Sequence, residues 1–520
     1  MQQSTRYTAT IALIVALGGF LMGFDASVIS GVVGFIETEF TLSKIQVGWS
    51  VSSLALTATL GMMLAGPLSD RIGRRPVLKI AAILFAISAI ASAIAPDFLL
   101  LIIARMIGGF GVGAALIIAP MYIAEIAPPA LRGRMVSFNQ LNIVIGISAA
   151  FFSNYLILTL GDSGAPWTEV IRLGEWNWRW MLGLETLPAI LYFVALLVGP
   201  ESPRWLAMQG RDDEAREVLI RFGSREQAEN DLQQVNASLE AEAELGRVSV
   251  RSLFHPSLRL VLTIGLSVGI LQQITGINSV FFYAPMIFEQ SGIGTNASFM
   301  QAVLVGLVNL GFTIAAIALI DKLGRRPLLG FGMTGIAVCM LTLAYGFGAA
   351  TYTLDQDAVD KLPVGIDRAQ IAAVVDTTYD SDIDFREAVS AAVGGDMYKQ
   401  HESPLVSSAI TMNPKLILFA ILGFVASFAV SIGPIMWVLF AELFPNRVRG
   451  MAISFVGLVN SAVAFFVTFI FPWELANIGN AGTFLIYGLF AVFGLFFVMR
   501  ILPETKGRSL EELERILVSD

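Results

Sequence analysis

The 520-residue chain contains little of what builds disulfide scaffolds, histidine relays or nucleic-acid surfaces. Its one cysteine, Cys339, cannot form a disulfide within the chain. Its two histidines, His255 and His401, fall in predicted loops, so no histidine relay is expected inside a predicted helix. Only 14% of the residues are charged, and the net charge of -8 argues against nucleic acid as a partner.

Apolar residues are abundant. Hydrophobic residues make up 55% of the chain, mean hydropathy is +0.72, and many apolar runs approach the roughly 20 residues that a helix needs to cross a bilayer. The first run is long and lacks a small-residue cleavage site, so we do not expect a cleavable signal. We predict an all-α membrane protein with twelve transmembrane helices, at 9–32, 46–68, 77–95, 98–124, 134–159, 180–199, 258–289, 299–320, 328–349, 414–443, 449–474 and 480–501.

The distribution of basic residues predicts the orientation of these helices. An even number of crossings places both termini on one side of the membrane. Most of the 33 Lys and Arg residues flank the helices on that side, and basic flanks stay in the cytoplasm. We therefore expect a multi-pass protein of the cell membrane with both termini cytoplasmic.

Three short motifs occur twice, once in each half of the predicted helices. Each copy follows the second, fourth or sixth helix of its half, on the predicted cytoplasmic side. This arrangement indicates duplication of a six-helix unit. The pairs are "GPLSDRIGRRP" (66–76) with "ALIDKLGRRP" (318–327), "IAEIAPPALRGR" (123–134) with "FAELFPNRVRGM" (440–451), and "PESPRW" (200–205) with "PETKGRS" (503–509).

The spacing between copies is longer for the second motif than for the first, which places an insertion between the ninth and tenth helices. This insertion is polar and acidic, so it is either a small subdomain or a disordered loop, and two helix-like segments favour partial order. The sequence suggests no function for it. The expected domains are two six-helix bundles at 1–199 and 258–501, a cytoplasmic helical linker at 200–257, an external insertion at 351–413 and a cytoplasmic tail at 502–520.

Together with "LQQITGINSVFFYAP" (271–285), these motifs resemble those of the sugar porter family of the major facilitator superfamily. The resemblance covers nearly the whole chain outside the insertion. It implies the major facilitator fold, in which two pseudo-symmetric six-helix bundles rock around a central site. It also implies a monosaccharide or polyol as cargo and a monomer as the working unit.

Neutral amides suit a sugar site, because sugar hydroxyls both donate and accept hydrogen bonds. Gln272, Gln273 and Asn278 supply amides in the seventh helix, and Gly276 allows a break between them. Taken alone, such amides also fit plain hydrogen bonding between membrane helices. The resemblance implies that these three residues contact the sugar together with Asn309, Trp437 and Asn460.

Aromatic and flexible residues flank this expected site. The resemblance assigns Phe282 and Tyr283 to a gate that caps the site from outside. Gly433 and Pro434 are expected to bend the tenth helix just before Trp437, which would otherwise fit simple packing.

Two positions depart from the family pattern. Ile147 stands where a glutamine is common, and Ser461 replaces a second aromatic residue. Both differences alter the pocket wall, so the sequence does not identify the sugar.

Asp25 interrupts the apolar run of the first helix, where a charge costs roughly 2.5 to 3.5 kcal/mol on insertion scales. It therefore needs a partner or a proton. Arg105 is the only basic residue inside a predicted span and away from its ends, and it belongs to the same bundle. The resemblance implies that Asp25 and Arg105 form the proton-coupling pair, with a static buried ion pair as the alternative. The nearby "GGFGVG" (108–113) is interpreted as close helix packing rather than a nucleotide loop.

Charged residues of the duplicated motifs are expected to form a cytoplasmic latch, in which Arg residues pair with carboxylates and hold the outward-open state until substrate binds. The alternative is that the basic residues only set the topology. The residues assigned to the cytoplasmic latch are Asp70, Arg71, Arg74, Arg75, Glu125, Arg132, Glu201, Arg204, Asp321, Arg325, Arg326, Glu442, Arg449 and Glu504.

The leading hypothesis is a symporter that imports a monosaccharide or polyol with protons. An uncoupled sugar facilitator is the closest alternative, and a sugar sensor that does not transport is a more distant one. An enzyme is not expected, because no nucleophile-base pair or metal-ligand cluster lies in the predicted membrane helices. The expected partners are therefore sugar, protons and the lipid bilayer, with no cofactor and no metal.

Overall fold

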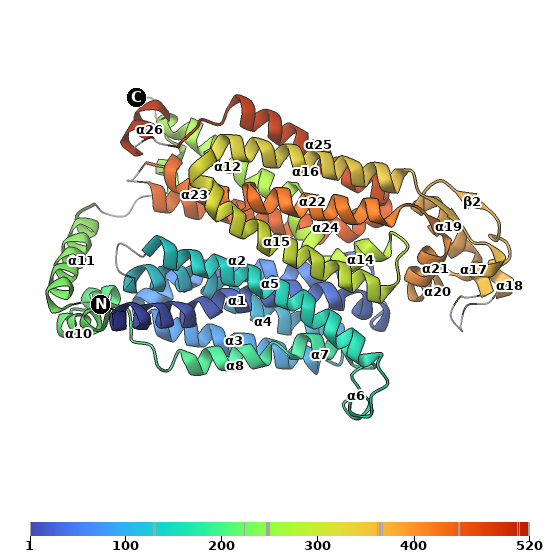
Figure 1. Ribbon diagram of the computed structural model, residues 1–520, viewed down its shortest axis with the longest axis horizontal. Coiled ribbons are helices and arrows are strands. Elements are labelled where there is room, and N and C mark those ends of the chain that lie inside the picture. The colour runs from blue at the N-terminus through green and yellow to red at the C-terminus, as the bar shows by residue number, and fades with distance from the viewer. Residues whose placement is uncertain are drawn as a thin grey trace. The chain divides into compact units, whose positions relative to one another are not determined.

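The computed structural model describes residues 2–127, 132–222, 224–245, 250–360, 362, 366, 368–445, 448–506, 508 and 510–517, most of them in helices (Figure 1). It divides into two compact units. Unit 1 comprises Met1–Val28, Ser53–Ala150 and Arg179–Ser249, and unit 2 comprises Ile29–Ser52, Phe151–Trp178 and Val250–Asp520. Helices α1 (Gln2–Glu39), α2 (Lys44–Ile72) and α5 (Arg132–Gly161) each contribute residues to both units.

Eleven helical segments of the described chain are long and apolar enough to cross a membrane. The remaining predicted span, 180–199, is present but interrupted: α7 (Asn177–Gly183) and α8 (Thr186–Ala195) are separated by Leu184 and Glu185. The prediction of twelve apolar helices therefore agrees with the structure, except that the sixth is broken at a glutamate.

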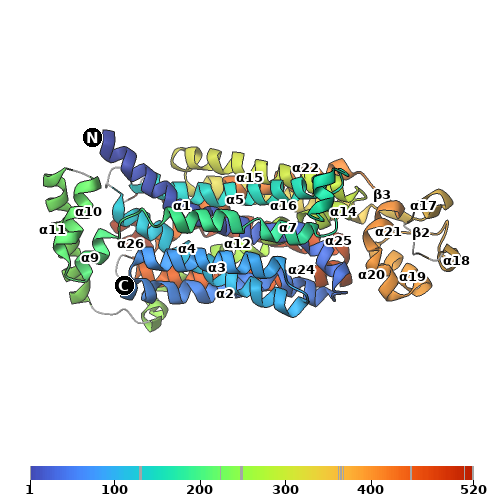
Figure 2. The same cartoon turned by 90° about the horizontal axis from the view of Figure 1, so that it is seen from below.

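Unit 1 also holds α3 (Arg74–Ala93) and α4 (Phe98–Ile126), and its last part, after α8, forms three further helices. Asp97 caps α4 by accepting a hydrogen bond from the Leu100 backbone N–H at 2.9 Å. The helical linker predicted at 200–257 contains α10 (Asp212–Phe222) and α11 (Arg225–Leu245), preceded by α9 (Pro203–Met208). The three helices lie together in Figure 2.

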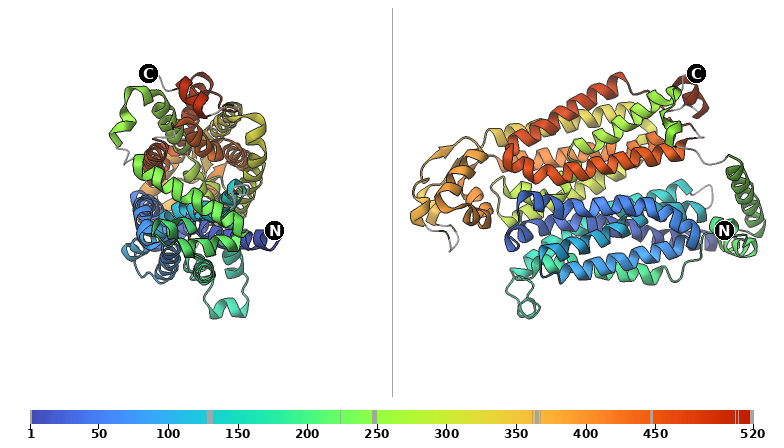
Figure 3. Two further views of the ribbon diagram at one scale, coloured as in Figure 1. Left: turned by 90° about the vertical axis from the view of Figure 1, so that its left-hand side faces the viewer. Right: turned by 180° about the vertical axis from the view of Figure 1, so that it is seen from behind.

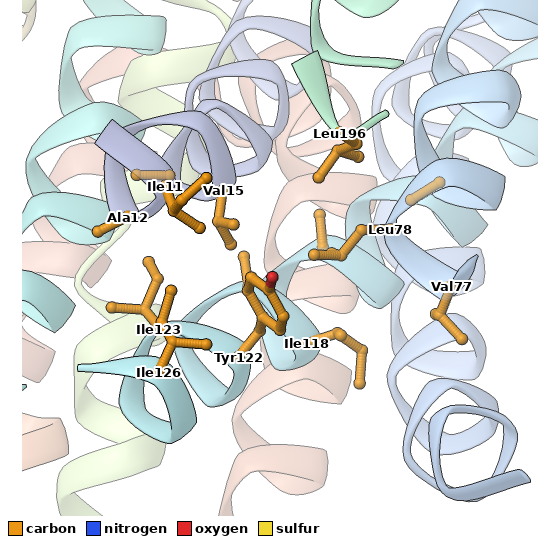
Figure 4. Packing of buried hydrophobic residues seen from close by; sticks show 14 of the residues in the cluster. Ile11, Ala12, Val15, Val77, Leu78, Ile118, Tyr122, Ile123, Ile126 and Leu196 are labelled. Atoms are coloured by element: carbon orange, nitrogen blue, oxygen red, sulfur yellow. The ribbon is translucent and has the colours of Figure 1, made fainter. Parts of the chain in front are cut away.

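The core of unit 1 is built from the apolar faces of these helices. Figure 4 shows Tyr122 and Ile118 of α4 facing Val15 of α1, Leu78 of α3 and Leu196 after α8. All five are at most 2% exposed. Tyr122 also donates its hydroxyl to the Pro200 carbonyl, so the one polar atom of this buried ring is satisfied.

The long helices of unit 2 are interrupted where its polar residues cluster. The expected break at Gly276 is confirmed, because this residue has φ 86° and separates the first two of three consecutive helices. The expected bend near Gly433 is also confirmed, with Ser431 between two helices. The helices of unit 2 outside the insertion that are not yet named are α6 (Pro166–Val170), η1 (Val250–Phe254), η2 (Pro256–Leu258), α12 (Arg259–Ile274), α13 (Ile277–Phe282), α14 (Ala284–Glu289), α15 (Thr295–Leu323), α16 (Arg325–Gly348), α22 (Pro414–Val430), α23 (Ile432–Leu443), α24 (Arg449–Asn477), α25 (Gly479–Arg500) and α26 (Leu510–Leu517).

The insertion at 351–413 folds as a small subdomain, called here the insertion subdomain, which settles the choice between order and disorder for its described residues. Tyr352 of the central strand pairs with Tyr379 on one side and Ile410 on the other, and its ring packs on Phe385. Figure 3 (right) shows this segment, in orange, beyond the ends of the unit 2 helices. Its elements are β1 (Thr351–Thr353), α17 (Gln356–Asp360), α18 (Arg368–Ile371), β2 (Thr378–Tyr379), α19 (Asp382–Val393), α20 (Gly395–Gln400), α21 (Glu402–Ala409) and β3 (Ile410–Thr411), with strand order β2-β1-β3.

Candidate functional site

Asp25 of α1 and Arg105 of α4 form an ion pair in the core of unit 1. Arg105 Nη1 donates to Asp25 Oδ1 and, at 3.2 Å, to the Asp25 backbone carbonyl. Asp25 is 0% exposed and Arg105 is 1% exposed. The structure thus brings together the two residues predicted as a pair, in a place where a lone charge would be costly.

Glycines on α4 allow this close approach. A Cβ atom at Gly108 would lie 2.8 Å from Asp25 Oδ2 and 2.5 Å from Ser88 Oγ. One residue further, a Cβ atom at Gly109 would lie 2.5 Å from the Leu54 carbonyl of α2. The interpretation of 108–113 as a packing segment is therefore supported, and the packing also leaves room for the Asp25 carboxylate.

Glu185 is a third buried charge at this site, and the sequence analysis missed it. It lies at the break between α7 and α8, is 1% exposed, and is close enough to Asp25 and Arg105 for their charges to act on it. Among the described residues, Glu185 Oε1, Asp25 Oδ2 and two nitrogens of Arg105 have no hydrogen-bond partner. The signal was present, because Glu185 falls inside a predicted span just as Asp25 does.

Two carboxylates facing one guanidinium make a site that can hold a proton. With all three groups ionised the site carries one uncompensated negative charge in a desolvated core, which is unfavourable. A single bound proton removes that charge. The orphaned atoms also give Arg105 a second carboxylate to pair with if Asp25 is protonated.

Four of the predicted amides of unit 2 form one hydrogen-bonded cluster, called here the amide cluster. Gln273 accepts from Asn278 Nδ2 at 2.9 Å and donates to Asn460 Oδ1 at 3.2 Å and to Gln272 Oε1 at 3.2 Å. Asn460 donates to Gln272 Oε1 at 2.9 Å and to the Gly269 carbonyl at 2.7 Å. Four of the six predicted sugar-contacting residues therefore meet, from α12, α13 and α24.

The break in the seventh helix brings these amides together. Beyond Thr275 and Gly276 the chain restarts as α13, and a Cβ atom at Gly276 would lie 2.4 Å from the Tyr487 ring. Only glycine combines this left-handed backbone with so close a neighbour. Gln272 also reaches the interruption in the tenth helix, since its Nε2 lies 3.4 Å from the Gly433 carbonyl.

The other predicted site residues make no hydrogen bond to the cluster in the described structure. Asn309 is buried in α15. Trp437 is 47% exposed and packs edge-on against Phe440. Phe282 is half-buried, whereas Tyr283 is fully buried and donates its hydroxyl to the Thr468 carbonyl at 3.1 Å.

The two departures from the family pattern sit in different units. Ile147 is half-buried in α5 of unit 1, and Ser461 is half-buried in α24 of unit 2, next to Asn460. Ser461 therefore directly adjoins the amide cluster.

Arg74 organises the charged end of unit 1. Its Nε and Nη2 bind the two oxygens of Glu125, each at 3.0 Å, and its Nη1 binds Asp70 Oδ1 at 2.8 Å. The backbone N–H groups of Arg74 and Arg75 donate to Glu201 Oε1 at 3.0 and 3.2 Å. Burial raises the pKa of Glu201 above its ordinary value, although these N–H groups oppose the shift.

Unit 2 repeats this arrangement with the second copies of the motifs. Arg325 Nη2 binds Glu442 Oε1 at 2.7 Å, and the backbone N–H groups of Arg325 and Arg326 donate to Glu504 at 3.0 and 3.1 Å. Burial opposes ionisation of Glu504, but the N–H groups of Lys506, Arg325 and Arg326 outweigh it and hold the pKa of Glu504 below its ordinary value. The same contacts in both units support the predicted duplication.

The remaining residues assigned to the cytoplasmic latch are Arg71, Arg204, Arg449, Arg132 and Asp321. Arg71 is exposed, and Arg204 is half-buried beside a cavity that Asp70, Arg74 and Glu125 also line. Arg449 donates to the Phe444 carbonyl at 3.1 Å. The side chains of Arg132 and Asp321 lie outside the described part of the structure.

Apolar helices with repeated motifs in two halves, a buried ion pair and a buried amide cluster define a membrane transporter of the major facilitator type rather than an enzyme. The sequence profile of the sugar (and other) transporter family matches residues 11–364 and 390–517, leaving part of the insertion subdomain unmatched. The chain belongs to this family.

Related proteins and solved structures support the same family assignment. It is 35% identical to the arabinose-proton symporter of Bacillus subtilis (strain 168), covering 99% of this chain and 96% of that one. It is 34% identical to the D-xylose-proton symporter of Escherichia coli (strain K12), over 99% and 96% of the two chains. The inward-open structure of the xylose transporter XylE from E. coli aligns with a TM-score of 0.73 and 31% identity, covering 98% of this chain and all of the other.

Proposed function

We propose that the protein is a symporter that imports a monosaccharide or polyol together with protons by alternating access. The observation that carries the proposal is the buried Asp25–Arg105 pair with Glu185 beside it. A facilitator does not need a titratable ion pair in its core, whereas a proton-driven transporter does.

In the proposed cycle Asp25 is the proton carrier. Protonation of Asp25 weakens its hold on Arg105, because a neutral carboxyl group attracts the guanidinium less strongly. Arg105 can then turn toward Glu185, which keeps the core neutral. Return of Arg105 to Asp25 favours release of the proton. Glu185 is thus a positioning residue for Arg105.

The amide cluster is the proposed sugar site. Its amides hydrogen-bond to one another, so a sugar would replace amide–amide bonds with amide–hydroxyl bonds at small desolvation cost. Coupling requires only that bound sugar and protonated Asp25 favour the same states of the transporter.

The finer assignments are part of the same proposal. Bundles 1–199 and 258–501 rock around the site, Asn309 and Trp437 complete it, and Phe282 and Tyr283 gate it from outside. The charged residues of the duplicated motifs form the cytoplasmic latch. Both termini face the cytoplasm at the cell membrane. The working unit is a monomer embedded in lipid.

The test is uptake of a panel of radiolabelled pentoses, hexoses and inositol into proteoliposomes, with and without an inward proton gradient. We expect wild type to accumulate one or more of these above equilibrium only with the gradient. Asp25→Asn should lose accumulation while sugar exchange persists. Uptake that only equilibrates, and that ignores both gradient and substitution, would establish a facilitator instead. No uptake of any sugar would favour a sensor.

A further inference from the structure

The insertion subdomain is attached to the turn between α24 and α25. Asp382 Oδ2 accepts hydrogen bonds from the backbone N and the Nδ2 of Asn480, at 3.0 and 2.8 Å. One turn further along α19, Arg386 Nη1 donates to the Ala476 carbonyl at 2.7 Å. Gly479, with φ 80°, forms the turn, and a Cβ atom there would lie 2.8 Å from Asp382 Oδ1. The subdomain therefore moves with the last two long helices.

A second attachment reaches the beginning of α2. Lys44 Nζ lies 2.9 Å from Glu402 Oε2 of the subdomain and 2.8 Å from Glu37 Oε1 of α1. Arg386 Nη2 lies 3.5 Å from the other oxygen of Glu402. Burial disfavours ionisation of Glu402, but the charges of Lys44 and Arg386 outweigh it and hold its pKa below the ordinary value. Glu402 is therefore ionised at neutral pH.

Partial burial makes this pair stronger than an ordinary surface ion pair. The side chains of Lys44, Glu402 and Glu37 are 22%, 17% and 14% exposed. Solvent and salt screen such a network less than fully exposed charges.

The two attachments join helices from opposite halves of the duplicated sequence. Helix α2 belongs to the first six long helices, whereas α24 and α25 belong to the last six. If the two halves move against each other, Lys44 travels with α2, and Asp382 stays with α25. Opening at this end of the molecule must break the Lys44–Glu402 pair but can leave the Asp382–Asn480 bonds intact.

We propose that the insertion subdomain is a clamp that stabilises the state closed at this end, through the ion pair between Lys44 and Glu402. The clamp rests on the alternating access of the proposed function and adds to it a control of how often the protein opens outward. Docking of another protein is not favoured, since no described residue of the subdomain is an exposed large hydrophobic side chain.

A cavity of about 250 Å³ lies beside the clamp, and a cysteine placed in it can report opening of the protein at this end. Ser30 of α1 lines it together with Glu37, Glu289 and Ser403. The Ser30 side chain is 3% exposed, and its hydroxyl has no hydrogen-bond partner among the described residues. A cysteine at this position loses no hydrogen bond and should be shielded until the clamp releases.

The experiment compares labelling rates of Ser30→Cys in a Cys339→Ala background, using a membrane-impermeant maleimide on intact cells. Into this background we place Lys44→Met, Glu402→Gln and the two together. Asp396→Asn is the matched control, because Asp396 pairs with Lys399 at 3.9 Å in the same subdomain but is 97% exposed.

We expect each single substitution to raise the labelling rate roughly fivefold or more. The double substitution should add little to either single one, since both remove the same interaction, and Asp396→Asn should change nothing. Unchanged labelling in both single variants would overturn the clamp, as would a double variant whose effect is the product of the single effects.

A further variant tests the attachment to the last helices. Asp382→Ala removes the acceptor for Asn480 while leaving Lys44 and Glu402 in place. We expect it to raise labelling as well, and an unchanged rate would contradict the clamp. Because labelling needs neither sugar nor a proton gradient, failure of the clamp can be distinguished from failure of symport.

Discussion

Arg105 and Asp25, 80 residues apart in the sequence, are joined in the core of unit 1 by hydrogen bonds from one guanidinium nitrogen to both the carboxylate and the backbone carbonyl of Asp25. The hydrogen bond from Arg105 to the Asp25 backbone carbonyl remains available when the Asp25 carboxylate is protonated. In the proposed cycle, Arg105 therefore need not leave α1 completely to turn toward Glu185. This geometry suits a reversible switch better than a permanent structural bridge.

Glu185→Gln should shift the pH dependence of transport. A negative neighbour favours protonation of Asp25, so its removal should move the midpoint of proton-driven uptake to lower pH. The measurement is uptake against pH in proteoliposomes. Glu175→Gln is the control, because Glu175 forms an exposed pair with Arg172 at 3.1 Å. A pH profile of uptake unchanged from wild type would mean that Glu185 has only a packing role.

Gly48→Val should hinder closure at the end where the insertion subdomain lies. A Cβ atom at Gly48 would lie 1.9 Å from the Phe469 carbonyl of α24, and Trp49 packs on the ring of Phe469 with 6.1 Å between centroids. Overpacking of this kind costs about 1 to 3 kcal/mol, so we expect transport to fall roughly tenfold while sugar still binds from outside.

The matched control for Gly48 is Gly34→Val, because a Cβ atom at Gly34 meets nothing within 4 Å. Binding and uptake should be measured on the same membranes. Equal uptake by the two valine variants would contradict the steric explanation.

Arg74→Ala should destabilise the protein more than Arg71→Ala. Arg74 is 4% exposed and binds Glu125 and Asp70, so its removal leaves the Glu125 carboxylate, whose side chain is 9% exposed, without its cationic partner, at a cost of about 3 kcal/mol. Arg71 is exposed on the same helix end. Thermal unfolding in detergent should show a clearly lower Tm for Arg74→Ala, and similar Tm values for both variants would argue that the basic residues only set topology.

Gln273→Leu should weaken sugar binding through the amide cluster. Leucine removes three hydrogen bonds and leaves buried amides unpaired, each worth about 1 to 3 kcal/mol. We expect affinity for the transported sugar to fall at least about tenfold in equilibrium binding. Gln356→Leu, on the exposed face of α17, is the control. If Gln273→Leu bound sugar with wild-type affinity, the sugar site would have to lie outside the amide cluster.

Much of the local structure could be predicted from the sequence, because a membrane helix pairs the hydrogen-bonding groups of its own backbone. Apolar runs, the break at Gly276 and the linker helices all follow from composition and from backbone preferences of single residues. The break at Glu185 was missed, since hydropathy averaged over a window hides one charge within an apolar run.

The sequence by itself determined the apolar helices, their duplication, and the pairing of Asp25 with Arg105, because a buried charge in a bilayer needs a countercharge and only Arg105 lay away from the span ends. Only the tertiary structure decided that Glu185 joins that pair, that each motif arginine binds the carboxylates of its own unit, and that the insertion links α2 to α25. These are contacts between residues far apart in the chain, and they depend on how helices pack rather than on what each segment forms alone.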